Sequence, residues 1–466
     1  MTDDAVSRAL LVDLYELTMA DVYRREGIAG EPATFSLFVR ALPASRGYLV
    51  AAGLDAALDW LEHLHFGPAE LAAIDRLGIF GDEFLDWLAD LRFHGTVRAV
   101  PEGTIVFSQE PILEVDAPIA TAQLAETFLL NQITFQTTLA TKAARLRHAA
   151  GDRAVTDFAL RRTQGIDAGM HVARSCRLVG LPATSNVAGA LRYGLEAAGT
   201  MAHSFVQAHP DEMEAFRIFV RALADAAVLL VDTYDPVLGI ERAVAVAAEA
   251  RARGVNVAGI RIDSGDLATL ARYARRRLDD EGLASVRIYA SGGLDEYRID
   301  ELVHEAHAPI DGFGVGAALG VSDDAPVLDT AYKLVAFRGR PVRKTSPGKV
   351  TYPGPKQVWR AEDWSGDTLA LADEPPPAGR VRPLLAPVLH DGVRVGAGAH
   401  DLAQARSHFE REWRELPEQL KDLREPPRHH VALSTRLEEL VHTLDAEHEP
   451  HEPTIARAEG GEARSS

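Results

Sequence analysis

Four residues that could handle anions or protons lie in the stretch 156–209. Arg161 and Arg162 follow a short apolar run, Ser185 follows a proline turn, and His203 lies in a loop after a glycine. Paired arginines suit phosphate or carboxylate groups, because the planar guanidinium donates two parallel hydrogen bonds. A loop histidine suits proton transfer or covalent phosphorylation. Taken alone, an arginine pair is more often an ordinary surface pair, so an anion-binding role needs support from the rest of the chain.

A second group of polar residues follows two apolar runs further along the chain. Arg261 and Asp263 alternate at the end of one run, and Asp232 follows another. Alternate residues of a strand face the same side, so the Arg261 and Asp263 side chains can point into one cleft. The arginine can hold an anionic group, and an aspartate can bind ribose hydroxyls or help to place Mg²⁺. Ser264 has a plainer interpretation, as the residue that caps the following helix.

Glycines follow the last two apolar runs. Gly292 and Gly293 come directly after Ser291, and the second set is Gly314-Val315-Gly316. Bare backbone N–H groups in such loops can face a phosphate. Either set alone is a weak signal, because glycine is common in turns. Two consecutive sets at the ends of strands predict a phosphate-binding site.

The elements that would position these residues alternate between strand and helix. After a long helix from Glu126 to Ala149, strand candidates end at Ala159, Val231, Ile262, Ala290 and Gly312, with helices between them. This alternation predicts an α/β fold with a parallel sheet, in the form of an irregular or incomplete TIM-like barrel. In such barrels the chemistry lies where strands end and loops begin. The arginine pair, Asp232, Arg261 with Asp263, and the two glycine sets all occupy such positions.

The rest of the chain divides around this barrel. We predict an N-terminal α/β domain at 1–125, completed by the β-rich segment at about 331–400. The barrel domain then covers 126–330. An amphipathic pattern predicts C-terminal helices at 401–446, and the polar composition of 447–466 predicts a disordered tail.

Composition excludes several classes of protein. The 466 residues carry a net charge of −19, whereas a nucleic-acid surface needs a basic footprint. No apolar run reaches membrane-spanning length, and the acidic N-terminus lacks the plan of a signal peptide. A single cysteine, Cys176, permits no internal disulfide. These features predict a cytoplasmic protein without nucleic-acid or membrane partners.

Taken together, the motifs resemble those of the nicotinate phosphoribosyltransferase family over nearly the whole chain. The matching segments are Asp13-Leu14-Tyr15, Leu17-Thr18-Met19, FSLFVR at 35–40, Pro101-Glu102-Gly103-Thr104, Glu126-Thr127, Leu129-Leu130-Asn131, Thr141-Lys142-Ala143-Ala144-Arg145, Phe158 to Gly165, Thr184-Ser185-Asn186, Gly199-Thr200, Ala202-His203-Ser204, Val231 to Asp235, Asp263 to Asp266, Phe313 to Gly316, Pro353-Gly354 and Lys356-Gln357-Val358. No single motif decides the matter, but so many in the right order make chance agreement improbable.

The resemblance implies an enzyme of NAD salvage with a type II phosphoribosyltransferase fold. Such an enzyme joins nicotinate to phosphoribosyl pyrophosphate, forming nicotinate mononucleotide and pyrophosphate. Family members couple this ligase-like glycosyl transfer to ATP hydrolysis through a phosphohistidine, which here would be His203. Mg²⁺ is the implied cofactor, and its protein ligands stay unassigned. The implied assembly is a homodimer whose active sites are shared between subunits.

The resemblance also assigns roles to individual residues. The catalytic residues would be His203, Asp263 and Arg261; the substrate-binding residues would be Tyr15, Phe158, Arg161, Arg162, Ser185, Asp232, Ser291, Gly292, Gly293, Gly314, Val315 and Gly316. Phe158 and Tyr15 of the partner subunit would sandwich the pyridine ring. The four glycines would bind the 5′-phosphate. The family usually has a threonine after the last glycine, whereas this chain has Ala317, so one hydroxyl contact to phosphate is absent.

Three alternatives stay open at this point. Nicotinamide phosphoribosyltransferase shares the fold, quinolinate phosphoribosyltransferase uses a diacid, and a catalytically silent paralogue would only bind. Ser185 favours nicotinate, because nicotinamide-using relatives have an aspartate at this position, which would repel a carboxylate. The presence of His203, Arg161, Arg162 and Asp263 together argues against a silent paralogue.

Overall fold

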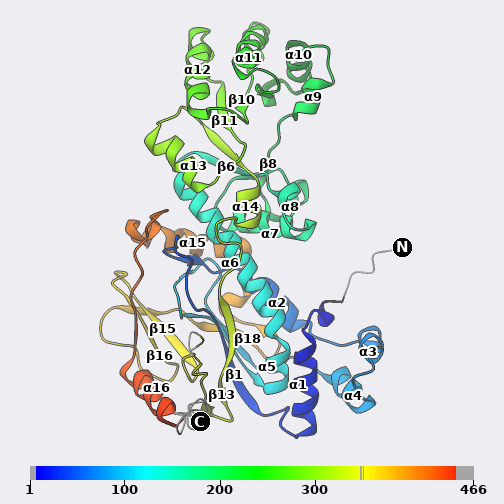
Figure 1. Cartoon of the computed structure of the whole chain (residues 1–466), viewed down its shortest axis with the longest axis vertical. Coiled ribbons are helices and arrows are strands. Elements are labelled where there is room, and N and C mark those ends of the chain that lie inside the picture. The colour runs from blue at the N-terminus through cyan, green and yellow to red at the C-terminus, as the bar shows by residue number, and fades with distance from the viewer. Residues whose placement is uncertain (1–6, 347–348, 350, 448–466) are drawn as a thin grey trace, which may run out of the picture.

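The long helix α6 (Glu126–Ala150) runs between the two main bodies of the molecule in this computed structural model (Figure 1). The structure describes residues 7–346, 349 and 351–447. Helix α6 contains no glycine or proline, and Gly151 ends it with a φ of 60°. Its small apolar residues, including Ala140, Ala143 and Ala144, are completely buried. The helix predicted from Glu126 to Ala149 is therefore confirmed, and it forms a shared wall of both bodies.

The upper body in Figure 1 is built on a seven-stranded parallel sheet in the order β8-β7-β6-β12-β11-β10-β9. The strands are β6 (Ala154–Asp157), β7 (Ala183–Thr184), β8 (Glu196–Ala197), β9 (Val228–Leu230), β10 (Gly259–Ile262), β11 (Arg287–Ala290) and β12 (Gly312–Val315). Strand β12 pairs back to β6, as in a barrel, with Phe313 opposite Val155. Among the described residues no ladder joins β8 to β9, so the sheet is an open half-barrel. The predicted parallel α/β sheet is confirmed, but the sheet stops short of a TIM-type closed barrel.

Helices follow the strands of the half-barrel. They are α7 (Ile166–Leu178), α8 (Val187–Tyr193), α9 (His203–Gln207), α10 (Glu212–Leu223), α11 (Pro236–Arg251), α12 (Leu267–Asp280), α13 (Glu296–Asp300) and α14 (Ala317–Val321). The apolar faces of α11 and α12 cover the sheet, with Ile240, Ala243, Ala271 and Ala274 at 0% exposure. This alternation of strand and helix places every strand-to-helix loop at one edge of the sheet.

The lower body contains an antiparallel sheet in the order β14-β13-β1-β5-β3-β18-β19. Its strands are β1 (Pro32–Val39), β3 (Thr96–Ala99), β5 (Pro111–Pro118), β13 (Thr330–Phe337), β14 (Arg340–Pro341), β18 (Ala386–His390) and β19 (Val393–Arg394). Strands β13 and β18, which follow the half-barrel in the chain, pair with β1 and β3. A small hairpin-like pair, β2 (Leu49–Val50) and β4 (Ile105–Val106), lies beside α6. The N-terminal sheet is thus completed by late segments of the chain.

Five short helices accompany the lower sheet: α1 (Leu14–Arg25), α2 (Leu54–Glu62), α3 (Pro68–Asp75), α4 (Asp82–Asp90) and α5 (Ile119–Leu124). Helices α2 and α4 are amphipathic, and their Leu58, Leu61, Phe84 and Leu88 side chains enter the lower core. Burial of each such side chain contributes about 1.5–3 kcal/mol. Three-residue or four-residue 3₁₀ turns occur at Arg8–Leu10, Leu160–Arg162, Ala224–Ala226, Gly396–Ala399 and Glu418–Lys421, and a π turn at Glu301–Glu305.

The C-terminal part of the chain contains strands as well as helices. Helices α15 (Leu402–Glu415) and α16 (Thr435–Glu447) are separated by β20 (Val431–Leu433). Strand β20 joins β15 (Lys356–Ala361), β16 (Asp367–Leu371) and β17 (Val381–Pro383) in a four-stranded sheet. The prediction of helices alone at 401–446 is therefore incomplete, because a three-residue strand carries too little pattern to detect. The predicted disordered tail falls almost wholly on residues 448–466, which lie outside the described residues.

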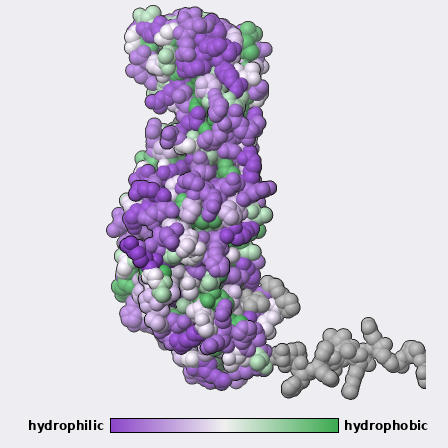
Figure 2. All heavy atoms as spheres, turned by 90° about the vertical axis from the view of Figure 1, so that its left-hand side faces the viewer, coloured by the Kyte–Doolittle hydropathy of each residue, from purple (hydrophilic) through white to green (hydrophobic). Residues whose placement is uncertain are grey.

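The face of the molecule in Figure 2 is mostly hydrophilic, with hydrophobic residues in small separate patches. That surface agrees with the net charge of −19. Within residues 7–346, 349 and 351–447, we find no helix with both the length and the apolar character needed to cross a bilayer.

Candidate active site

A cavity of about 270 Å³ opens at the carboxyl ends of the half-barrel strands. Its lining residues come from strand β10, which carries Arg261, and from the loops after β6, β7 and β8, which carry Phe158, Leu160, Arg161, Ser185, Gly199 and Thr200. A deeper cavity of about 400 Å³ continues from Phe158 and Arg261 along the concave face of the sheet. The structure thus brings together four residues that the sequence singled out, namely Phe158, Arg161, Ser185 and Arg261.

Phe158 is fixed between two strands. Its backbone N–H donates to the Val315 carbonyl oxygen at 2.8 Å, which extends the β6–β12 ladder. Its ring lies directly against the backbone of Gly314, where an added Cβ would be 2.5 Å from Cδ2 and closer still to Cε2. One ring face is near Arg261, whose guanidinium carbon is 5.8 Å from the ring centroid. The ring therefore forms one wall of the cavity and cannot move toward β12.

The loops after β6 and β7 are tied together below the cavity by Asp157. Its carboxylate accepts hydrogen bonds from the Ala159 N–H at 2.7 Å and from the Thr184 hydroxyl at 2.6 Å. Burial raises the pKa of this carboxyl, while these hydrogen bonds from Thr184 and Ala159 oppose the increase. Asp157 thereby fixes the loop that carries Phe158 relative to the loop that carries Ser185.

Two arginines, Arg161 and Arg261, line the cavity and a third, Arg162, is adjacent in the chain; the three differ in exposure. Arg161 and Arg162 lie in the 3₁₀ turn after β6 and are exposed, and among the described residues neither forms an ion pair. Arg261 is largely buried and donates one hydrogen bond to the Met201 carbonyl oxygen at 3.1 Å, while its Nε has no partner. Burial lowers the pKa of Arg261, and Asp263 and Asp232 act against this. These unpaired guanidinium donors are available to a carboxylate or phosphate.

His203, Asp263 and Asp232 lie close together beside the cavity. His203 begins α9, and its Nδ1 lies 3.1 Å from the Thr233 hydroxyl. Its Nε2 lies 4.0 Å from the Asp263 carboxylate, and both side chains are about two-fifths exposed, at 42% and 37%. Asp263 also accepts from the Ser291 hydroxyl. The imidazole is therefore held by a neighbour on one nitrogen while the other faces a carboxylate and solvent.

Thr233 and Ser264 are two site residues that sequence reasoning did not assign to this group. Ser264 was expected to cap α12, but its hydroxyl donates to Asp232 at 2.5 Å. The cap of α12 is Asp266, whose carboxylate accepts from the Thr269 N–H at 3.2 Å. Both residues have short oxygen side chains that suit a cap, so only the three-dimensional neighbour distinguishes them.

The glycine loops lie at the same edge of the sheet. Gly292 has a φ of 87°, and an added Cβ would be 2.9 Å from the Asp263 carbonyl carbon and closer still to its oxygen, so no larger residue fits. Gly293 has a φ of 61° and faces open space. The prediction that Gly314 and Val315 lie in a loop is wrong, because both lie within β12 and only Gly316 follows it. The run of glycines hid the true start of that strand, which is Gly312.

Comparison with known proteins assigns this site to a family. A model of the nicotinate phosphoribosyltransferase N-terminal domain matches residues 10–134, and a model of the nicotinate phosphoribosyltransferase family matches residues 153–346. The chain belongs to the nicotinate phosphoribosyltransferase family. It is 47% identical over 433 residues to nicotinate phosphoribosyltransferase pncB2 of Mycobacterium tuberculosis, which covers 92% of each chain.

Other members of the nicotinate phosphoribosyltransferase family agree in sequence and fold. The Bacillus subtilis nicotinate phosphoribosyltransferase is 42% identical, over 80% of this chain and 77% of that protein. The crystal structure of human nicotinic acid phosphoribosyltransferase superposes with a TM-score of 0.80 at 29% identity. The superposition covers 93% of this chain and all of that one. The family resemblance inferred from the motifs is therefore confirmed.

Tyr15, one of the residues that the family resemblance selects, does not meet Phe158 within one chain. It lies on α1 in the lower body, whereas Phe158 belongs to the upper one (Figure 1). Its side chain is 44% exposed and has the carboxylates of Glu126, Glu16 and Asp13 nearby. Burial and these carboxylates raise the pKa of the phenol. A role at the pyridine ring therefore requires a second subunit.

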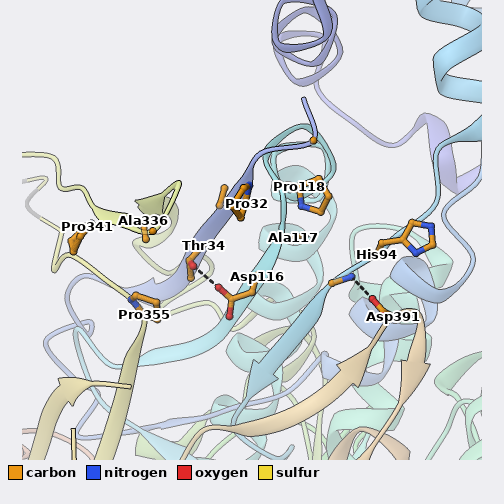
Figure 3. Close-up of a pocket in the computed structure, with 14 residues that line it drawn as sticks. Pro32, Thr34, His94, Asp116, Ala117, Pro118, Ala336, Pro341, Pro355 and Asp391 are labelled. Atoms are coloured by element: carbon orange, nitrogen blue, oxygen red, sulfur yellow. Dashed lines mark hydrogen bonds between the residues drawn. The ribbon is translucent and has the colours of Figure 1, made fainter. Parts of the chain in front are cut away.

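A larger hollow of about 560 Å³ lies at the edge of the lower sheet, away from the half-barrel site (Figure 3). Prolines, alanines and glycines line most of it, including Pro32, Pro118 and Pro355. Its two carboxylates already accept hydrogen bonds within the chain. Asp116 accepts from the Thr34 hydroxyl, and Asp391 accepts from the Gly95 N–H at 3.1 Å. It lacks the converging donors of the half-barrel site, so size alone does not make it the reaction centre.

Proposed function

We propose that this protein is a nicotinate phosphoribosyltransferase of NAD salvage. It joins nicotinate to the ribose of phosphoribosyl pyrophosphate and releases nicotinate mononucleotide and pyrophosphate. The observation that carries the proposal is 47% identity, over 92% of each chain, to a relative with this name. The cavity at the half-barrel edge supports it, because an aromatic wall and two arginines surround a space of about 270 Å³.

The pyridine ring would stack on Phe158, and its carboxylate would lie near Arg161, Arg261 and Ser185. Offset stacking of aromatic rings contributes about 0.5–1.5 kcal/mol beyond the area buried. Arginine–carboxylate hydrogen bonds are charge-assisted and set the orientation of the ring. Ser185 can donate to the carboxylate, so this arrangement favours nicotinate over nicotinamide. Quinolinate would bring a second carboxylate against the apolar Leu160 and the Phe158 ring.

The reaction develops positive charge on the ribose carbon as pyrophosphate leaves, so positioning and charge stabilisation are the main contributions of the protein. The amides of the Gly292–Gly293 loop and of Gly316 would hold the 5′-phosphate. Asp263 lies in the same group and would bind ribose hydroxyls or oppose the developing positive charge. Arg162, exposed beside Gly316, would approach the phosphates.

Mg²⁺ fits this site as a cofactor shared between protein and substrate. Asp232 has one carboxylate oxygen, Oδ1, that is buried without a hydrogen-bond partner, and Asp263 is nearby. Among the described residues no cluster of three or more metal-ligating side chains occurs. That donor set suits Mg²⁺, which is commonly bound by one or two carboxylates with substrate phosphates. When bound, the ion would neutralise charge on the pyrophosphate.

His203 would be the phosphorylated residue in the coupling to ATP. Its Nδ1 is held by Thr233, and its Nε2 faces Asp263 and solvent, which leaves that nitrogen accessible to a phosphoryl group. Phosphorylation would add negative charge beside the substrate and could order the loop before α9. The glycosyl transfer itself does not need the imidazole, so coupling would tighten substrate binding rather than perform the bond cleavage.

The active form would be a homodimer in which Tyr15 of the partner subunit covers the pyridine ring. Three exposed apolar residues on α1, Leu14, Tyr15 and Val22, support a contact with another surface. Ile166 on α7 and Leu191 on α8 are 78% and 83% exposed, and each would offer apolar area to such a contact. A cytoplasmic location is part of the proposal, since the single thiol of Cys176 is buried and suits a reducing compartment.

The function is tested by incubating the protein with phosphoribosyl pyrophosphate, Mg²⁺ and one pyridine at a time, with and without ATP. Nicotinate should yield mononucleotide and pyrophosphate, and ATP should lower the KM for phosphoribosyl pyrophosphate. Equal turnover of nicotinamide, or turnover of quinolinate with release of carbon dioxide, would replace the proposal with one of the alternatives. Absence of turnover with all three pyridines, despite measurable ligand binding, would indicate a silent paralogue.

The role of His203 is tested with γ-phosphate-labelled ATP and mapping of the modified residue. His203→Ala should lose the label and the ATPase activity but retain some ATP-independent synthesis of nicotinate mononucleotide. Label on another residue, or ATP stimulation that is undiminished in the variant, would make His203 a purely structural residue.

A further inference from the structure

A buried ammonium on α6 contacts two segments that follow the phosphate loops. Lys142 is completely buried, and its Nζ lies 2.5 Å from Glu296, 2.9 Å from Asp323 and 2.9 Å from Asp324. Its three N–H donors therefore have three different carboxylate partners. Such an arrangement fixes the position of each partner relative to the helix.

Two further cations complete this cluster. Arg145, one helical turn after Lys142, donates from Nε to Glu296 at 2.8 Å and from Nη1 to the Ser45 carbonyl oxygen at 2.7 Å. Arg46 donates to Asp324 at 2.8 Å. Three cations thus face three carboxylates, and the cluster joins the lower body to the half-barrel without net charge.

The carboxylates follow the two phosphate loops at different distances, Glu296 at the start of its helix and Asp323 beyond the end of its helix. Glu296 is the first residue of α13, three positions after Gly293, and Asp323 follows α14, which begins directly after Gly316. The parent strands β11 and β12 are neighbours, with Ala290 opposite Phe313. Lys142 therefore links the segments that follow the two loops, and it does not itself line the cavity.

Stability alone does not explain this cluster. The desolvation cost of buried charges often exceeds their attraction, and well-packed apolar side chains of similar size commonly stabilise a core equally well. Burial acts to lower the pKa of Lys142, but Glu296 and Asp324 outweigh it and the pKa lies above its ordinary value. The ammonium is therefore charged, and what a charged group adds over an apolar one is directional contact with specific partners.

We propose that Lys142 is a positioning residue that holds the Gly292–Gly293 loop and the Gly316 loop at the spacing required by the 5′-phosphate of phosphoribosyl pyrophosphate. This inference rests on the proposed function and adds a residue that does not touch the substrate. Without the ammonium, Glu296 keeps its Arg145 contact while Asp323 loses its buried partner. The two loops then lose their common anchor, and their amides no longer converge on one phosphate.

The test compares Lys142→Met with the wild-type protein. Lys142→Met keeps the length of the side chain and removes the three contacts. A displacement of about 1 Å in a binding group can reduce catalytic efficiency about a hundredfold, so we expect the KM for phosphoribosyl pyrophosphate to rise about tenfold to hundredfold. Direct titration with ribose 5-phosphate should show the same loss. The KM for nicotinate, measured at saturating phosphoribosyl pyrophosphate, should change less than threefold, because Lys142 does not line the pyridine cavity.

Arg174→Met is the matched control. Arg174 is also buried and pairs with Glu102 at 2.6 Å, between α7 and the lower body, but it contacts neither glycine loop. Its loss should lower the melting temperature without changing the KM for phosphoribosyl pyrophosphate. Asp323→Asn is a milder variant, because Asp323 is half exposed, and it should raise that KM about threefold to tenfold. Should Lys142→Met fail to fold, the inference is tested by comparing the KM for phosphoribosyl pyrophosphate of Asp323→Asn with that of Arg174→Met.

Three outcomes overturn the inference. The first is unchanged ribose 5-phosphate binding in folded Lys142→Met or Asp323→Asn. The others are an equal rise of the KM values for phosphoribosyl pyrophosphate and nicotinate, or the same change in the KM for phosphoribosyl pyrophosphate in Arg174→Met. The failure of the proposed function is distinguishable from these. In that case the wild-type protein itself would not form nicotinate mononucleotide, whatever the variants bind.

Discussion

Gly314→Ala tests why a glycine occupies the middle of β12. The added Cβ would lie 2.5 Å from Cδ2 and 3.2 Å from Cζ of the Phe158 ring, and closer still to Cε2. Carbon atoms pack at about 3.5–4.0 Å, so the ring must move by about 1 Å into the cavity. Because Phe158 is held by its backbone bond to Val315, the ring can yield only by tilting over the space assigned to the pyridine.

The expected result is a selective loss of nicotinate use. A misplacement of about 1 Å costs up to about a hundredfold in catalytic efficiency, so kcat/KM for nicotinate should fall about tenfold to hundredfold. Overpacking should also lower the free energy of unfolding by about 1–3 kcal/mol. Binding of phosphoribosyl pyrophosphate alone should change little, because the Gly292–Gly293 loop does not contact the new methyl group.

The assay is steady-state synthesis of nicotinate mononucleotide, combined with calorimetric titration of phosphoribosyl pyrophosphate. Gly81→Ala is the control, since an added Cβ at Gly81 meets nothing within 4 Å. The double variant Phe158→Leu with Gly314→Ala should have nearly the same kcat/KM for nicotinate as Phe158→Leu alone, because the ring that the new methyl group would displace is absent. The reasoning is refuted by unaltered nicotinate kinetics in Gly314→Ala, or by a variant whose main defect is phosphate binding.

Three further predictions follow from the site and its surroundings. Ser185→Asp should reduce kcat/KM for nicotinate at least tenfold through charge repulsion, measured beside nicotinamide, and a fully active variant would remove Ser185 from the carboxylate site. Mixed dimers of the inactive variants Tyr15→Ala and Arg161→Ala should regain one competent site after subunit exchange; no recovery despite proven exchange would contradict shared sites. Burial lowers the pKa of His408 from 6.5 to about 4. The free energy of unfolding should therefore decrease by up to about 3 kcal/mol as pH falls from 6.5 to 4. Thermal melts of His408→Gln should show a weaker dependence of stability on pH in this range.

Local pattern was enough to predict most of the half-barrel. Apolar runs bounded by polar residues placed Arg161, Asp232, Asp263 and Gly292 at strand ends, and the structure has them there. Functional residues of such folds lie at the carboxyl ends of the strands, and parallel strands have these ends at one edge of the sheet. The sequence therefore correctly predicted that these residues lie at the same edge. The family motifs added Phe158, which no periodicity could select from other buried aromatics.

What local pattern could not provide was any contact between distant segments. Arg145 and Glu296 are 151 residues apart, and nothing near either one indicates the other. Strand β12 was misplaced because the run from Gly312 to Gly316 has few side chains to show alternation. The Thr233 contact with His203 depends on how the loop after β9 folds toward α9, which is also a tertiary property.

The completion of the lower sheet by late strands has a consequence during synthesis on the ribosome. At about 5–20 residues per second, the roughly 270 residues between β5 and β18 take roughly 15–55 seconds to emerge. Throughout that time β3 lacks its neighbour β18, and for most of it β1 lacks β13. Bare strand edges are templates for association with other nascent chains. Translation that stops between residues 316 and 329 would therefore release an aggregation-prone fragment, even though its half-barrel strands had all been made.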